Sequence, residues 1–131
     1  MKSKFALLLF LLSFAFFACD DNPYVQGQIL YKNFCENCHM EDGTGLQGII
    51  PPLAGSDYLA ANQGLLPCLI RNGYKGEMIV NGRIYNTEMQ AIKELTEFEI
   101  TNVINYINTA WGNDIEIVKH LDVRAALEAC E

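Results

Sequence analysis

The chain has 131 residues, 50% of them hydrophobic, with 16 acidic residues against 9 Lys and Arg. This length fits one small domain and is too short for an enzyme with two lobes around a cleft. The net charge of -7 argues against a nucleic-acid binder, which needs a basic face for phosphates. Four Pro and ten Gly exclude a fibrous or disordered chain. The five cysteines are the unusual feature of this composition.

The first 18 residues have the pattern of an export signal. Lys2 and Lys4 precede an apolar run over residues 5–18, which is shorter than a membrane-spanning helix requires. The sequence therefore predicts a signal peptide over residues 1–18 and a mature domain outside the reducing cytosol. Removal of this segment takes away two basic residues and no acidic one, so the mature domain is more acidic still.

The residues before the predicted cleavage site are Phe16-Phe17-Ala18, and Cys19 follows. This segment resembles the lipobox of bacterial lipoproteins, although Leu is more common where Phe16 stands. The resemblance implies that Cys19 becomes a lipidated N-terminus and that residues 19–22 form a lipid-anchored linker. Several acyl chains together give stable anchoring to a membrane. The alternative is that Cys19 stays a free thiol.

The strongest motif is Cys35-x-x-Cys38-His39, whose spacing is typical of covalent attachment of a c-type haem. Two thiols three positions apart at the end of a helix can each form a thioether to a haem vinyl group. The adjacent imidazole then lies under the iron as an axial ligand. The predicted cofactor is therefore covalent haem c with its iron, bound by Cys35 and Cys38 and ligated by His39.

Three other uses of the motif remain open. A thioredoxin-like redox pair lies between a strand and a helix, whereas this motif follows a helical stretch and precedes a loop rich in Gly and Pro. A zinc site requires a fourth ligand, for which His120, Cys68 or an acidic residue are candidates. The third alternative is a purely structural pair of cysteines.

The chain around this motif resembles the class I cytochromes c, which bind one haem at an N-terminal Cys-x-x-Cys-His and use a distal Met. The resemblance covers residues 23–111. In this family a Gly and an aromatic residue upstream of the motif pack against the C-terminal helix. Gly27 and Tyr31 match these two positions, and Val103 and Tyr106 match the receiving face. A glycine there lets two helices cross closely.

Residues 43–55 form a turn-rich, apolar segment, as expected of a loop that wraps a haem. The resemblance implies that the Pro51 carbonyl accepts a hydrogen bond from Nδ1 of His39 and fixes the imidazole. It also implies that Leu53 packs on the porphyrin. The alternative is a surface loop, in which so many glycines and apolar residues would have nothing to cover.

A haem closed on both sides needs a second axial ligand. Met89 lies in an irregular stretch before the last long helix, where this family carries its ligand Met, although Gln90 follows it instead of the common Pro. A thioether is a soft ligand that favours the reduced metal and raises the reduction potential. Met78 and His120 are the alternatives.

Cys68 and Cys130 remain once the other cysteines are assigned. An exported domain rarely keeps two spare thiols, so a Cys68–Cys130 disulfide is predicted to pin the C-terminal tail to the domain. Such a bridge closes a loop of about sixty residues and contributes roughly 4 kcal/mol in the chain-entropy model. The alternative is two unrelated buried thiols.

The patterns together predict an all-α, cytochrome c-type helical haem domain with one small β-hairpin, over residues 23–111, and a C-terminal extension with a short helix over 112–131. The expected elements are a helix from Asn22-Pro23 to about Asn37, a short helix from Ser56-Asp57, another over Gly64–Asn72, a hairpin over 77–86 around Asn81-Gly82, a helix opened by the capping box Thr96-x-x-Glu99, and a final helix over Val123–Ala129 with Asp122 as N-cap.

The functional prediction is a membrane-tethered, single-haem electron carrier rather than an enzyme, with the iron held between His39 and Met89. The expected partners are redox proteins with basic docking surfaces and a membrane surface, with neither nucleic acid nor a small-molecule substrate. The expected location is the periplasm or the cell exterior. The alternatives are a haem enzyme or a gas or peroxide sensor with an open sixth position, and a fixed electron-transfer subunit of one oxidoreductase complex.

Overall fold

The computed structural model describes residues 23–130, so the predicted signal peptide, Cys19 and the linker lie outside the described residues. The elements are α2 (Val25–Phe34), α3 (Glu36–His39), α4 (Asp57–Ala61), η1 (Gln63–Leu65), α5 (Leu66–Asn72), β1 (Met78–Val80), β2 (Arg83–Tyr85), α6 (Glu97–Thr109) and α7 (His120–Ala129). This order confirms the predicted helical fold with one small hairpin. No helix within residues 23–130 is long and apolar enough to cross a bilayer.

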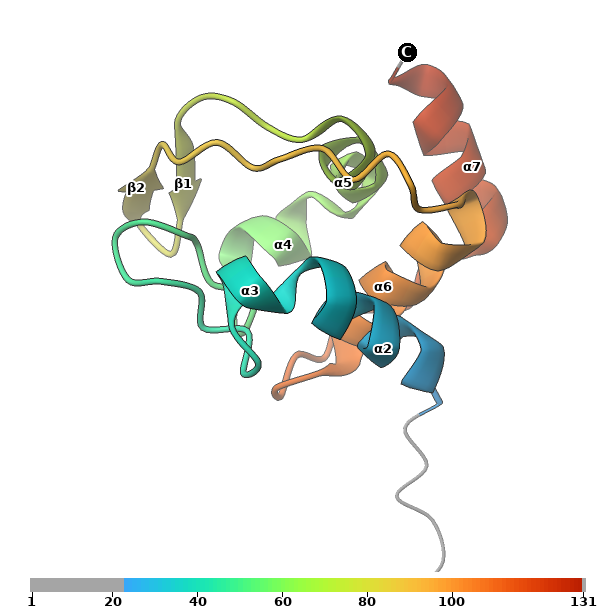
Figure 1. Ribbon diagram of the computed structural model, residues 1–131, viewed down its shortest axis with the longest axis horizontal. Helices are drawn as coiled ribbons and strands as arrows, with labels where there is room; N and C mark the ends of the chain where they lie inside the picture. Colours follow the sequence, from blue (N-terminus) through green and yellow to red (C-terminus); the bar gives the residue numbers. More distant parts are fainter. Residues whose placement is uncertain (1–22, 131) are drawn as a thin grey trace, which may run out of the picture.

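The crossing of α2 and α6 is the most extensive contact between helices of residues 23–130 (Figure 1). Helix α6 begins at the predicted capping box, in which the N–H of Glu99 donates to the Thr96 hydroxyl and the N–H of Thr96 donates to the Glu99 carboxylate. A Cβ at Gly27 would lie 2.8 Å from the Cβ of Tyr106 and closer still to the carbonyl of Asn102. Only glycine therefore permits this crossing.

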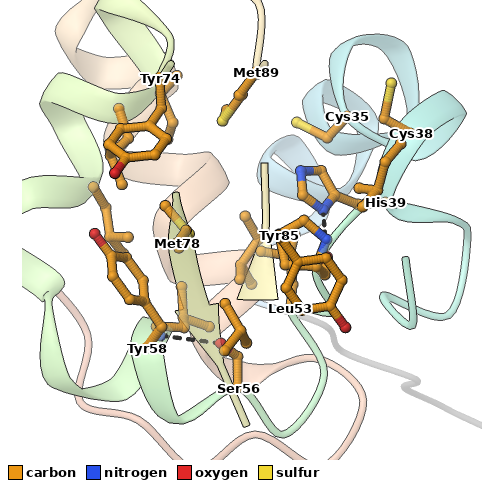
Figure 2. A pocket seen from close by; sticks show the side chains of 18 of the residues that line it. Cys35, Cys38, His39, Leu53, Ser56, Tyr58, Tyr74, Met78, Tyr85 and Met89 are labelled. Atoms are coloured by element: carbon orange, nitrogen blue, oxygen red, sulfur yellow. Dashed lines mark hydrogen bonds between the residues drawn. The ribbon is translucent and has the colours of Figure 1, made fainter. Parts of the chain in front are cut away.

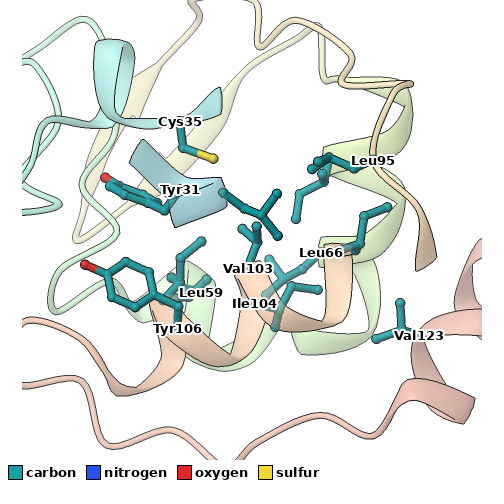
Figure 3. Packing of buried hydrophobic residues seen from close by; sticks show 13 residues of the cluster. Tyr31, Cys35, Leu59, Leu66, Leu95, Val103, Ile104, Tyr106 and Val123 are labelled. Atoms are coloured by element: carbon teal, nitrogen blue, oxygen red, sulfur yellow. The ribbon is translucent and has the colours of Figure 1, made fainter. Parts of the chain in front are cut away.

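The hydrophobic core lies where α6 meets α2, α5 and α7 (Figure 3). At one end of this core the rings of Tyr31, Tyr106 and Trp111 pack against one another, with centroids 5.0–5.5 Å apart. Aromatic pairs with such geometry contribute about 0.5–1.5 kcal/mol each beyond their buried area. These rings therefore hold the α2–α6 crossing together.

The hairpin has the predicted Asn-Gly turn. Asn81 and Gly82 both adopt positive φ, 50° and 73°, as a type I′ turn requires. The register pairs Met78 with Tyr85. Because paired residues share one face of a sheet, and Tyr85 is buried, this face of the hairpin is turned toward the interior of the molecule.

Two predicted boundaries in the first half of the chain are wrong. Pro23 lies in a turn, and α2 begins at Val25 and ends before Cys35, whose φ and ψ of -120° and -36° break the helix ahead of α3. The predicted helix over Gly64–Asn72 is divided into η1 and α5. Pro67 sits in the first turn of α5, where its missing N–H costs no helical hydrogen bond.

The start of the last helix is also corrected. Helix α7 begins at His120 with Lys119 as N-cap, so Asp122 lies in the first turn instead of capping it. The His120 ring stacks on Phe98 with centroids 4.1 Å apart, and its Nε2 lies 3.4 Å from the Glu97 carboxylate. These tertiary contacts explain why the helix begins about one turn before its predicted start at Val123.

The C-terminal extension is tied to the domain by buried asparagines. Asn108, with no exposed surface, donates to the Gln63 side chain at 2.7 Å and to the Glu116 carbonyl at 2.9 Å. Asn105 makes reciprocal hydrogen bonds of 3.1 and 2.8 Å with the backbone of Val118. Since an unpaired buried amide is costly, these bonds fix the path of the extension along α6.

The predicted disulfide between Cys68 and Cys130 is present, with the two Cα atoms 5.8 Å apart. It joins the middle of α5 to the residue that follows α7. Figure 1 shows α7 at the end of the molecule away from the hairpin, beside α5 and α6.

Candidate functional site

An apolar cavity of about 240 Å³ opens between α3, the hairpin and the segments around residues 50–53 and 87–92, and residues of helices α4, α5 and α6 also line it (Figure 2). Aliphatic side chains such as Leu59, Ile70 and Ile104 make most of its wall. The cavity brings together all of the residues predicted to bind haem: Cys35, Cys38, His39, Pro51, Leu53 and Met89.

Cys35 and Cys38 lie at one edge of the cavity as free thiols. Burial, together with the neighbouring Cys38, raises the pKa of Cys35 to about 12, so this thiol is protonated at neutral pH. The thiolate of a thioredoxin-like pair instead has a lowered pKa and follows a strand. Here the motif follows helix α2, so the structure disfavours that alternative.

The two named candidates for a zinc ligand are engaged outside the cavity. Cys68 is bonded to Cys130, and His120 is stacked on Phe98. Across residues 23–130, no three His, Cys, Asp or Glu side chains form a group that could hold a metal ion.

The imidazole of His39 is oriented by the loop that follows it. Its Nδ1 lies 3.1 Å from the carbonyl oxygen of Pro51, so the predicted hydrogen bond is present. Because a carbonyl only accepts, Nδ1 carries the proton and Nε2 keeps a lone pair for a metal. Burial lowers the pKa of His39 despite this bond, which favours the neutral ring. The N–H of Leu53 donates to the Gly43 carbonyl at 2.7 Å, so the two ends of the loop that carries Pro51 are joined by a hydrogen bond.

Tyr31 fixes the backbone directly after the motif. Its side chain is 1% exposed, and its hydroxyl donates to the Met40 carbonyl at 2.6 Å. Burial raises the pKa of this phenol, so it stays protonated and able to donate. Met40 itself has a φ of 64°, an uncommon value for a residue with a side chain. The sequence predicted the packing of Tyr31 on α6 but not this hydrogen bond.

Met89 lies across the cavity from His39, and its sulfur points into the cavity (Figure 2). Its backbone pairs with Tyr74 through two hydrogen bonds of 2.9 Å. Gly73, with a φ of 74°, leaves room for this pairing, because a Cβ there would collide with the Met89 carbonyl. Met78, on β1, lines the same cavity, so both candidate thioethers face it, whereas His120 is stacked elsewhere.

Three tyrosines in the cavity wall were missed by the sequence analysis: Tyr58, Tyr74 and Tyr85. Tyr85 had a usable signal, since it alternates with the exposed Ile84 in a strand and therefore faces inward. Tyr58 lies on the short helix α4 and Tyr74 in a loop, where no local periodicity marks an inward side chain.

The arrangement fits haem c. Two thiols lie at one edge for the vinyl groups, a neutral imidazole whose Nε2 keeps a lone pair faces the cavity from one wall, and a soft thioether faces it from another. The apolar wall suits a porphyrin, whose faces are themselves apolar. Fold and site therefore define the class of small c-type haem proteins.

The comparison with known families agrees. The family model described as Cytochrome c matches residues 24–111, more than half of the chain. The chain therefore belongs to the cytochrome c family, whose cofactor is covalent haem c with iron and whose members are typically electron carriers rather than enzymes.

Two proteins similar to this chain are also described as cytochromes c. The chain is 39% identical over 83 residues to cytochrome c-552 of Thermus thermophilus, covering 60% of this chain and 63% of that protein. It is 30% identical over 92 residues to the cytochrome c subunit of the quinone alcohol dehydrogenase of Gluconobacter oxydans, covering 67% of this chain and 19% of that subunit. The chain thus spans less than two thirds of the length of either relative.

Proposed function

We propose that the chain is a membrane-tethered monohaem cytochrome c that passes single electrons between redox proteins. The observation that carries this proposal is the presence of His39 and Met89 on different walls of one apolar cavity, with Cys35 and Cys38 at its edge. An iron held by both His39 and Met89 would exchange electrons with little rearrangement and would offer no position to a substrate.

In the proposed mechanism each residue of the cavity has one task. When bound, haem c supplies an iron that alternates between Fe(III) and Fe(II). Cys35 and Cys38 would hold it covalently through thioethers, since addition of a thiol S–H across a vinyl group needs no oxidant. His39 presents Nε2, with Pro51 holding the other nitrogen. Met89 supplies a thioether, which favours the reduced state.

Water exclusion is the task of the apolar wall. Leu53 is half-buried and packs against the core beside the cavity, as do Met89 and Ile92. A dry surrounding keeps the ligands from exchanging with water and lowers the reorganisation that accompanies each electron. Leu53 is therefore the residue we expect to cover the porphyrin face on the His39 side.

Export and tethering are the second part of the proposal. Membership of the cytochrome c family and the signal-like sequence ahead of the matched segment support export. The Cys68–Cys130 disulfide is consistent with it, since disulfides persist outside the reducing cytosol. Lipidation of Cys19 would hold the domain on a membrane surface, through the linker over residues 19–22.

The expected partners are redox proteins with basic docking surfaces. The whole chain carries a net charge of -7; Glu36 lies within the haem motif, and Glu41 and Asp42 follow it closely. Hydrogen bonds from the Thr44 hydroxyl and N–H lower the pKa of Asp42, so its carboxylate stays charged in mildly acidic solution. Charge complementarity of this kind raises association rates more than it raises affinity.

A second candidate function is a fixed subunit of one oxidoreductase complex. The similarity to the cytochrome c subunit of the Gluconobacter oxydans quinone alcohol dehydrogenase favours it. A third, an enzyme or sensor with an open sixth position, is disfavoured by the thioether of Met89 in the cavity.

Two measurements on the exported holoprotein test the proposal. Redox titration is expected to fit a single one-electron couple, and fractionation is expected to find the protein in the membrane fraction. Cys19→Ser is expected to leave the titration unchanged and to release the protein from membranes, because lipidation requires the thiol. Retention of this variant on the membrane would contradict lipid tethering, and a two-electron couple would contradict the monohaem carrier.

A further inference from the structure

The disulfide lies on the same helix that supports the proposed Met89 ligand. Cys68 is in α5, and Cys130 follows α7, 62 positions away in sequence. Asn72, at the end of α5, adds a hydrogen bond of 3.3 Å from its side chain to the Cys130 carbonyl. Helix α5 is therefore fastened to the C-terminal tail at its middle and at its end.

Backbone contacts run from α5 to the segment that carries Met89. The N–H of Gly73 donates to the Leu69 carbonyl at 2.9 Å and ends the helix. Tyr74, the next residue, makes the two reciprocal hydrogen bonds with Met89. The N–H of Ile92 donates to the Ile70 carbonyl at 2.9 Å.

The Met89 segment depends on these contacts. Among the described residues, the backbone hydrogen bonds of residues 87–92 all join this segment to Ile70 and Tyr74. In Figure 1 the segment after the hairpin passes along α5 on its way to α6. Arg71 adds a side-chain hydrogen bond of 3.1 Å to the Lys93 carbonyl. A displacement of α5 would therefore displace Met89.

Helix α5 cannot hold this position by itself. It has seven residues, and an isolated helix of that length is unstable in water. Its place depends on packing against α6 and α7 and on the covalent link to the tail.

We propose that the Cys68–Cys130 disulfide is a positioning element for Met89, which keeps the thioether at the iron by holding α5 in place. This inference rests on the proposed function, in which Met89 is the sixth ligand. The disulfide takes no part in electron transfer, and both of its cysteines act through α5 and the Gly73–Tyr74 turn.

The test compares ferric holoproteins by their affinity for imidazole, which competes with the thioether for the iron. Cys68→Ser/Cys130→Ser is expected to raise the apparent association constant for imidazole by about tenfold or more, which takes only a fraction of the stabilisation a long-loop disulfide supplies. Trp111→Phe is the control, because its contacts with Tyr31, Tyr106, Gly43 and the Glu41 carbonyl involve neither α5 nor the segment that carries Met89. It is expected to lower the denaturation midpoint without a comparable change in imidazole affinity.

The outcomes separate the inference from the proposed function. If the double serine variant binds imidazole like the wild type, or if both variants shift in proportion to their loss of global stability, the positioning role is wrong. Met89→Ala decides the other question. If this variant keeps the red-edge absorption band of ferric thioether ligation, Met89 is not the ligand and the proposed ligation itself fails.

Discussion

Met89 and Met78 present two thioethers to the same cavity from differently built backbones. Met89 lies in an irregular segment paired with Tyr74 and pressed against Gly73, whereas Met78 lies in a regular hairpin paired with Tyr85. The sequence could prefer Met89 over Met78 as the iron ligand only by resemblance, because reaching the iron depends on contacts far apart in the chain. The haem-binding motif, in contrast, could be predicted from the spacing of Cys35, Cys38 and His39 alone.

Replacement of each methionine by Ala distinguishes the two. Met89→Ala is expected to remove the red-edge band of the ferric protein and to lower the reduction potential, by part of the roughly 0.8 V range that axial ligation spans. Met78→Ala is the matched control and is expected to keep the band. Absorption spectroscopy and redox titration measure both. The reverse pattern would assign the ligand to Met78.

The elements that the sequence predicted well are those with local signals. The capping box of α6 and the Asn-Gly turn each depend on residues within four positions, so pattern alone located them. The early start of α7 at His120 depends on tertiary contacts with Phe98 and Glu97. The sequence did not predict that Asn105 and Asn108 of α6 are buried, because a polar amide usually marks an exposed position on a helix.

The α2–α6 crossing predicts a sharp difference between two glycines. Gly27→Ala is expected to cost about 1–3 kcal/mol of unfolding free energy, since the new methyl would collide with the Asn102 carbonyl and Tyr106. Gly64→Ala, in η1, has no neighbour within 4 Å of the added Cβ and is expected to stay within about 0.5 kcal/mol of wild type. Chemical denaturation measures both, and equal losses would rule out close packing at Gly27.

The capping box of α6 gives a pH dependence of known sign. A hydrogen bond from the backbone N–H of Thr96, and a smaller effect of the one from its hydroxyl, lower the pKa of Glu99 below its usual 4.5. A lowered pKa means that this contribution to stability is present above pH 4.5 and is lost as the pH falls through the lowered value. Glu99→Gln, which can still cap, is expected to flatten this part of the profile. An unchanged acid limb in thermal melts would contradict the assignment.

At the scale of the whole molecule, the hairpin and the haem motif border the cavity, and α7, whose following residue is bonded to α5 through the disulfide, lies at the end away from the hairpin (Figure 1). The acidic composition was readable from the sequence, and so was the pairing of Cys68 with Cys130, because few cysteines remained. How the extension supports α5, and through it the Met89 segment, required the structure.

The net charge predicts how electron transfer with a basic redox partner depends on salt. The second-order rate constant is expected to fall as ionic strength rises, because the Debye length shrinks from about 10 Å at 0.1 M salt to about 3 Å at 1 M. A small anionic oxidant serves as the control and is expected to react faster with added salt. Stopped-flow measurements that show no salt dependence with the protein partner would contradict electrostatic steering.

Acid-acetone extraction of the holoprotein, produced where cytochrome maturation enzymes are active, tests most directly that Cys35 and Cys38 hold a haem covalently. The haem is expected to stay with the precipitated polypeptide, and with the peptide containing residues 35–39 after proteolysis. Haem that passes into the acetone and leaves a colourless polypeptide would contradict covalent attachment at these two thiols.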